Sequence, residues 1–513
     1  MVPSHSFSRA KTALCYALMF IIGALTVLSF APYNIWPVLP LALAAALWCG
    51  EKLPLSTTKL WWWFAFGSFA TGISWVHVSM VRYGELPIVV AVLLMALLSG
   101  YLALFPALAG WCYSKLKSPK ASLWNLCLLF PALWVLAEWA RGWVLTGFPW
   151  LWLGYSQTEG PLRPLAADIG TLGISFIVIS VAGAVTLIAL KRFFTLPIWL
   201  LILSVGLYAA PHYNPVKRTG KTVNVALVQG NIPQSMKWHP EALWPTLLKY
   251  MDLTRPHFAD TDLVIWPEAA VPALEQDTQE FLDNANRAAN LNNTAIVSGV
   301  ISYEHGDFYN SLIVLGNARQ QQQSAGDYQL NDNNRYRKHH LLPIGEFVPF
   351  QSLLRPLAPF FNLPMSSFSE GQYHQDNLHA AGYTLAPAIC YEIAFPEQLR
   401  ENVNNNTDML LTVSNDAWFG ESNGPLQHMQ IAQMRAVELG RPLLRGTNNG
   451  ATAVVDEHGN ITDKLPQFEA GVLTSKVALV KGMTLFNRFG QWPILLLTTL
   501  LLLLALVRKK MKI

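Results

Sequence analysis

Long apolar runs are the feature that most constrains how this chain can fold. Each run is near the length that a helix needs to cross about 30 Å of hydrocarbon, although two of them are short. The composition agrees, because 52% of the residues are hydrophobic and only 13% are charged. We therefore predict a multi-span α-helical membrane domain. The eight predicted spans are residues 12–30, 36–50, 60–80, 87–112, 122–140, 169–190, 194–210 and 491–507.

Basic residues between these runs indicate the orientation in the membrane. If the N-terminus is cytoplasmic, every basic cluster falls on one side, as the positive-inside rule requires. These clusters are Arg9 and Lys11; Lys52 and Lys59; Lys115, Lys117 and Lys120; Lys191 and Arg192; and Arg508, Lys509, Lys510 and Lys512. No convincing cleavage site follows the first run, so we interpret it as an uncleaved helix. Both termini are then cytoplasmic, and residues 211–490, between the seventh and the eighth span, are external.

A different pattern begins after the seventh run. Residues 222–481 alternate short β-prone runs with helix-like spacing, which predicts an α/β sheet domain covered by helices. The expected organisation is a membrane domain at 1–211 with seven helices, a catalytic domain at 222–481, and an eighth helix with a basic tail at 489–513. The net charge is only +4 and the basic residues are scattered in short clusters, which gives no indication of nucleic-acid binding.

Three side chains capable of chemistry each follow a β-prone run of this external domain. They are Glu268, Lys338 and Cys390, and Cys390 is the only cysteine outside the apolar segments. A lone cysteine is more often a small buried hydrophobe, and lone charges are usually solvated. Together, however, a carboxylate base, a cation and a thiol are sufficient for acyl transfer through a covalent intermediate.

Metal chemistry is not expected. His339 and His340 are adjacent, so their side chains point in different directions on regular structure, and no third ligand is evident. No CxxC pair is present either. We therefore predict neither a metal nor a cofactor.

The combination and order of the motifs resemble the nitrilase (carbon-nitrogen hydrolase) superfamily. The matching segments are Trp266-Pro267-Glu268, Tyr336-Arg337-Lys338-His339-His340-Leu341, Ile389-Cys390-Tyr391-Glu392 and Asn415-Asp416-Ala417-Trp418-Phe419-Gly420. With the flanking apolar runs, the whole chain resembles the membrane branch of that superfamily, the apolipoprotein N-acyltransferase family of the bacterial inner membrane.

The resemblance implies an αββα sandwich with a periplasmic active site. It implies transfer of an acyl chain from a phospholipid, phosphatidylethanolamine being the expected donor, to the N-terminal amine of a diacylglyceryl-cysteine apolipoprotein through a Cys390 thioester. Glu268 would be the general base and acid, and Lys338 would stabilise the oxyanion. The expected supporting residues are Glu346, which would hold Glu268 and Lys338, and Trp238, Tyr391 and Glu392, which would line or support the acyl pocket.

Other interpretations of the sequence remain open. An apolar loop at 351–371 is either a lid that contacts lipid or an ordinary buried segment. The alternative enzyme is a membrane-tethered nitrilase-type amidase with water as the second nucleophile. A transporter would carry charged residues within its spans, and few are found. A structural protein with an inactive domain would tolerate loss of the three residues, which are all present here.

Overall fold

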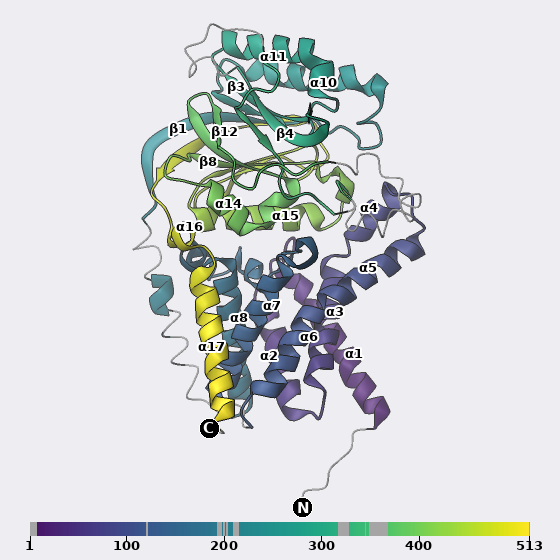
Figure 1. Ribbon diagram of the computed structural model, residues 1–513, viewed down its shortest axis with the longest axis vertical. Helices are drawn as coiled ribbons and strands as arrows, with labels where there is room; N and C mark the ends of the chain where they lie inside the picture. Colours follow the sequence, from purple (N-terminus) through teal and green to yellow (C-terminus); the bar gives the residue numbers. More distant parts are fainter. Residues whose placement is uncertain are drawn as a thin grey trace, which may run out of the picture. The chain divides into compact units, whose positions relative to one another are not determined.

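The structure is a computed structural model, shown in Figure 1, that divides into two compact units. It describes residues 8–119, 122–191, 197, 201, 204–208, 215–316, 328–343, 345–347 and 368–511. The helical unit comprises residues 1–77, 86–214 and 489–513, and the second unit comprises 78–85 and 215–488. The short segment 78–85 therefore groups with the sheet domain, although its first three residues belong to the third apolar run, 60–80. The three domain limits expected from the sequence stay a prediction.

The helical unit follows the apolar runs closely. Its helices are α1 (Arg9–Leu25), α2 (Val38–Lys52), α3 (Thr57–Gly72), α5 (Ile88–Leu102), α6 (Leu104–Leu116), α7 (Phe130–Arg141), α8 (Ala166–Ala189) and α17 (Trp492–Lys510). Helix α4 (Val76–Arg82) follows α3 at a bend of 49°. Among the described residues four helices are long and apolar enough to cross a membrane, or five if α3 and α4 form one span. The eight-span topology stays a prediction, and most of the seventh run lies outside the described residues.

Small residues bring two of these helices together. A Cβ atom added at Gly23 of α1 would lie far inside van der Waals contact of the Phe64 carbonyl, and one at Gly67 of α3 would do the same at Phe20. The Thr71 hydroxyl also donates a hydrogen bond to the Ala24 carbonyl at 3.1 Å. Helices in lipid associate through such close packing, because hydrophobic burial gives them little driving force there.

The second unit contains two six-stranded sheets among its described residues. One has the order β12-β1-β2-β3-β4-β5, and the other has the order β11-β10-β9-β8-β7-β6. In each sheet three central strands are parallel (β1, β2 and β3; β7, β8 and β9) and the remaining pairs are antiparallel. The strands are β1 (Lys217–Gln229), β2 (Leu263–Ile265), β3 (Ala295–Glu304), β4 (Asp307–Leu315), β5 (Arg335–Arg337), β6 (Leu378–Ala380), β7 (Tyr383–Ile389), β8 (Met409–Ser414), β9 (Leu443–Thr447), β10 (Ala453–Val455), β11 (Ile461–Lys464) and β12 (Gly471–Lys481).

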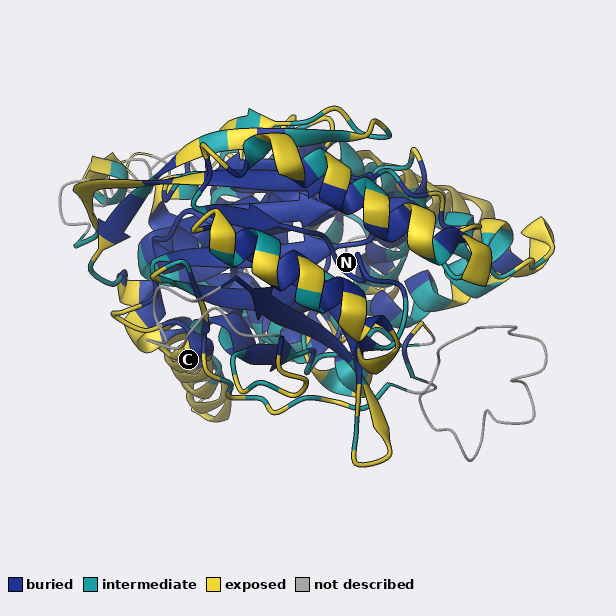
Figure 2. Ribbon diagram, turned by 90° about the horizontal axis from the view of Figure 1, so that it is seen from above, coloured by how far each residue is buried: buried dark blue, intermediate teal, exposed yellow. Residues whose placement is uncertain are grey.

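Helices cover both outer faces of this pair of sheets, as Figure 1 shows. The larger covering helices are α10 (Pro240–Thr254), α11 (Gln279–Leu291), α14 (Pro396–Asn402) and α15 (Gly424–Leu439). In Figure 2 the central strands are mostly dark blue, whereas α10 and α11 alternate between buried and exposed residues. The expected αββα sandwich is confirmed.

The two-residue period of a strand builds the core on both sides of a sheet. In β1, Val225 and Leu227 face the core between the two sheets, whereas Ala226 and Val228 pack with the helices on the outer face. A strand buried on both faces needs an unbroken apolar run, and Val225–Val228 is one. The two layers therefore hold the strand ends, where the candidate catalytic residues lie, in fixed positions.

Candidate active site

The ends of three strands carry the three predicted catalytic residues. Glu268 follows β2 through Trp266 and Pro267, Lys338 directly follows β5, and Cys390 directly follows β7. The structure brings all three together, because Lys338 Nζ lies 3.7 Å from Glu268 Oε1 and both groups interact electrostatically with Cys390. The carboxyl ends of strands are where α/β folds collect their chemistry.

Cys390 lies on a strained turn. Its φ is +53°, in the left-handed region that a residue with a side chain rarely adopts, and it begins the short helix η10 (Cys390–Ala394). Cys390 as a whole residue is partly buried, and its Sγ lies 3.4 Å from the Ser414 hydroxyl. Strain of this kind persists only where the surroundings hold it in place, and it is frequent at active sites.

Glu392 supplies much of that support. Its buried carboxylate accepts hydrogen bonds from the Ile389 backbone N–H at 2.7 Å and from the His339 and His340 backbone N–H groups at 2.7 and 3.0 Å. It also accepts from the Tyr336 hydroxyl at 3.0 Å. One carboxylate thus ties the turn at Cys390 to the segment that carries Lys338.

Lys338 is buried between two carboxylates. Its Nζ lies 2.7 Å from Glu346 Oε2, and the Asn310 amide donates to Glu268 Oε1 at 2.8 Å and to Glu346 Oε1 at 2.9 Å. Burial disfavours the charged lysine, but Glu346 and Glu268 outweigh it and raise the pKa of Lys338 above its ordinary value. The lysine is therefore a fixed cation at neutral pH.

Cys390 is a thiol at rest. Burial raises its pKa first, the neighbouring Glu268 carboxylate raises it further, and Lys338 only partly opposes them. Since the thiolate is the nucleophilic form, a base must remove the proton during the reaction. Glu268 is oriented for this by the Asn415 backbone N–H, which donates to its Oε2 at 2.9 Å.

Two residues beside Glu268 received no role in the sequence analysis. Lys237 is buried, and its Nζ donates to the Glu268 backbone carbonyl at 3.1 Å. Burial lowers the pKa of Lys237 to about 8, against the opposing effect of Glu268. The other is Asn415, whose backbone N–H holds the carboxylate. Asn415 belongs to a segment that resembles the superfamily, but nothing local in the sequence indicates that either residue reaches Glu268.

A second buried group lies behind Cys390. Asp416 accepts a hydrogen bond from Ser414 Oγ at 2.6 Å and pairs with Arg445 at 2.9 Å. His428 Nε2 lies 2.9 Å from the Cys390 carbonyl oxygen. Burial and Arg445 lower the pKa of His428, so the imidazole is neutral and its Nε2–H donates to that carbonyl. Through His428, this group supplies a second contact to the strained turn besides those of Glu392.

Two of the predicted supporting residues, Tyr391 and Trp238, make ring contacts with their neighbours. Tyr391 is buried, with its ring 5.1 Å from Phe395 and 5.9 Å from His340. Trp238 is half-buried beneath the Lys237 ammonium, at 5.8 Å. Most of the apolar loop at 351–371 lies outside the described residues. Within the described part of the chain, no group of three His, Cys, Asp or Glu side chains is arranged to hold a metal ion.

The fold and this site define a protein of the carbon-nitrogen hydrolase class. The Carbon-nitrogen hydrolase family model matches residues 224–482, and the model of the Apolipoprotein N-acyltransferase N-terminal domain matches residues 22–184. An Apolipoprotein N-acyltransferase of Shewanella oneidensis is 62% identical over 511 residues, covering 99% of this chain and 98% of that protein. One of Vibrio vulnificus is 48% identical over 511 residues, covering 98% of each. The chain belongs to the apolipoprotein N-acyltransferase family, which confirms the resemblance.

Among solved structures, a CN-hydrolase superfamily protein of Xanthomonas campestris, XC1258, matches with 17% identity and a TM-score of 0.37. The match covers 54% of this chain and 97% of that one.

Proposed function

We propose that this chain transfers an acyl chain from a membrane phospholipid to the N-terminal amine of a diacylglyceryl-cysteine apolipoprotein. Family membership supports the overall reaction. The observation that carries the mechanism is the Cys390 thiol on a strained turn beside the Glu268 carboxylate and the Lys338 cation. The proposed setting is the bacterial inner membrane, with the catalytic domain on the periplasmic face, both termini in the cytoplasm and phosphatidylethanolamine as the donor.

The first half of the reaction forms a thioester. Glu268 takes the thiol proton as Cys390 Sγ attacks the carbonyl carbon of the sn-1 ester. The negative charge that develops on the carbonyl oxygen is met by the Lys338 ammonium and by the backbone N–H of Tyr391. When the C–O bond breaks, Glu268 returns the proton to the departing alkoxide, and a lysophospholipid leaves.

The second half consumes the thioester. The neutral α-amine of the acceptor attacks the thioester carbonyl, and Glu268 removes a proton from the attacking nitrogen. The C–S bond then breaks, Cys390 is restored as a thiol by that proton, and the product is an amide. A thioester is more reactive toward amines than the phospholipid ester, so neither a nucleotide nor a metal is required for this step.

The test uses the purified full-length protein and a phospholipid with a traceable sn-1 chain. Intact mass is expected to show a hydroxylamine-sensitive acyl group at Cys390 that disappears when a lipopeptide with a free amine is added. Cys390→Ala is expected to carry none. If no label accumulates with or without acceptor while a simple amide is hydrolysed, the acyltransferase proposal fails and the tethered amidase replaces it.

A further inference from the structure

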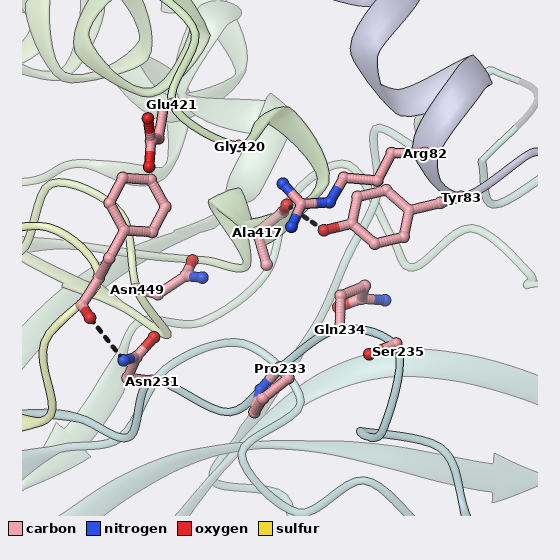
Figure 3. A pocket seen from close by; sticks show the side chains of 11 residues that line it. Arg82, Tyr83, Asn231, Pro233, Gln234, Ser235, Ala417, Gly420, Glu421 and Asn449 are labelled. Carbon is pink, nitrogen blue, oxygen red and sulfur yellow. Dashed lines mark hydrogen bonds between the residues drawn. The ribbon is translucent and has the colours of Figure 1, made fainter.

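A cavity of about 410 Å³ lies beside the active site, within the second unit. Figure 3 shows the side chains that line it, and the lining residues come from five separate segments of the chain. Its main polar lining residues are Arg82, Tyr83, Gln234, Glu421 and Asn449. None of them has a role in the proposed reaction.

The segment that carries Arg82 is fixed to the chain just after strand β8. The Ser79 hydroxyl donates to the Trp418 carbonyl at 2.7 Å, and the Tyr83 hydroxyl donates to the Ala417 carbonyl at 2.9 Å. The Tyr83 and Trp418 rings also pack edge to face at 5.1 Å. These contacts join α4 to the short helix η11 (Asp416–Phe419) and so hold Arg82 at the cavity.

Two opposite charges line the cavity. Arg82 and Glu421 are both exposed, and neither forms an ion pair with any residue that the structure describes. Figure 3 shows their side chains coming from different segments of the cavity wall. Asn449 adds a third polar group: it is only 8% exposed, and its Oδ1 has no hydrogen-bond partner. A buried acceptor without a partner is costly unless a ligand or water in the cavity satisfies it.

The cavity is connected to the reacting carboxylate. Gln234, in its wall, accepts a hydrogen bond from the Asn415 side-chain amide at 2.6 Å. The backbone N–H of the same Asn415 donates to Glu268 at 2.9 Å. Asn415 therefore links the cavity wall directly to Glu268, the proposed general base.

We propose that this cavity binds the headgroup of the acyl donor, and that it is built for a zwitterion with a phosphate and a primary ammonium. This inference rests on the proposed function. Arg82 pairs with the phosphate, since a guanidinium matches phosphate oxygens in a forked geometry. Glu421 and the Asn449 carbonyl oxygen accept hydrogen bonds from the ammonium. A headgroup with phosphate alone satisfies Arg82 and leaves Glu421 without a partner.

The test compares two donors with identical acyl chains, phosphatidylethanolamine and phosphatidylglycerol, in mixed micelles with the full-length protein. The rate of thioester formation at Cys390 is measured by intact mass at increasing donor concentration. Glu421→Gln is expected to lower kcat/KM for phosphatidylethanolamine about fivefold to tenfold and to leave phosphatidylglycerol within twofold, because only the first donor carries an ammonium. Arg82→Gln is expected to lower kcat/KM for both donors.

Matched controls are Glu280→Gln and Arg255→Gln, which replace exposed charges away from the cavity and are expected to change neither donor. Discharge of the preformed thioester by a lipopeptide amine is expected to be unaffected in Arg82→Gln and Glu421→Gln, because the headgroup has left by then.

The outcomes separate this inference from the function beneath it. If the wild-type protein forms no thioester with either donor, the proposed function fails and the headgroup site fails with it. If the thioester forms but Glu421→Gln keeps the wild-type ratio between donors, only the headgroup site is refuted. If the variants slow discharge in place of formation, the cavity binds the acceptor and the inference is wrong.

Discussion

Replacing Glu346 with glutamine tests how the site holds its cation. The Glu346 carboxylate accepts from three donors: Lys338 Nζ at 2.7 Å, the Asn310 amide at 2.9 Å and the Leu342 backbone N–H at 2.8 Å. An amide oxygen accepts at most two hydrogen bonds, and its NH₂ group cannot accept any. Glu346→Gln therefore leaves at least one buried donor without a partner and removes the nearer counter-charge of Lys338.

The size of the effect follows from these contacts. A hydrogen bond to a charged group contributes about 1.5–3 kcal/mol, and Glu268 remains as a second counter-charge for Lys338 at 3.7 Å. A loss of about 2 kcal/mol in the transition state corresponds to about a 30-fold slower reaction. The lysine stays protonated at neutral pH because Glu268 still raises its pKa, so lowering the pH does not rescue the variant.

The assay is single-turnover thioester formation at saturating phospholipid, followed by intact mass. The matched control is Glu304→Gln, which breaks a neighbouring ion pair with Arg337 at 2.5 Å but does not touch Lys338. That control is expected to react within twofold of the wild-type rate. The reasoning is refuted if folded Glu346→Gln reacts within threefold of wild type, or if Glu304→Gln is slowed equally.

Three further outcomes are expected. Because the pKa of Cys390 is raised, the rate of its alkylation by iodoacetamide continues to increase above pH 9. Glu268→Gln moves this pH profile to lower pH, because it removes the carboxylate that disfavours the thiolate. Peptide mass spectrometry measures both profiles, and identical profiles in wild type and variant would contradict the effect of Glu268 on the thiol. The folded-state pKa of Lys237 is about 8, below its ordinary value, so the folded protein loses this proton at a lower pH than the unfolded chain does. The free energy of unfolding of the wild-type protein therefore rises by about 3 kcal/mol between pH 8 and 10.5, relative to that of Lys237→Met. A constant difference in unfolding free energy across that range would refute this. Asp416→Asn leaves the Arg445 guanidinium buried and unpaired and costs about 3–5 kcal/mol at pH 7. Against the effect of burial, Arg445 holds the pKa of Asp416 below its usual range, so the difference in thermal unfolding between wild type and variant narrows below about pH 4. A pH-independent difference would exclude the ion pair as its cause.

The sequence by itself determined the parts that depend on local pattern. An apolar run of span length predicts a helix wherever it lies, and α1, α8 and α17 fall where the runs predicted them. The β-prone run expected before Cys390 is β7 (Tyr383–Ile389), so Cys390 was correctly placed at a strand end. The catalytic roles of Glu268, Lys338 and Cys390 stay predictions, although the structure brings the three side chains together.

Only the tertiary structure decided which distant segments meet. β12 pairs with β1 across about half of the chain, and no local periodicity indicates that partner. Likewise, Lys237 reaches the Glu268 carbonyl, and the segment that carries Arg82 joins the catalytic unit rather than the helical one. The physical reason is that such contacts depend on how whole layers pack. The spacing of apolar residues in a strand or helix determines which of its faces is buried. Which other element covers that face depends on how all the layers pack together.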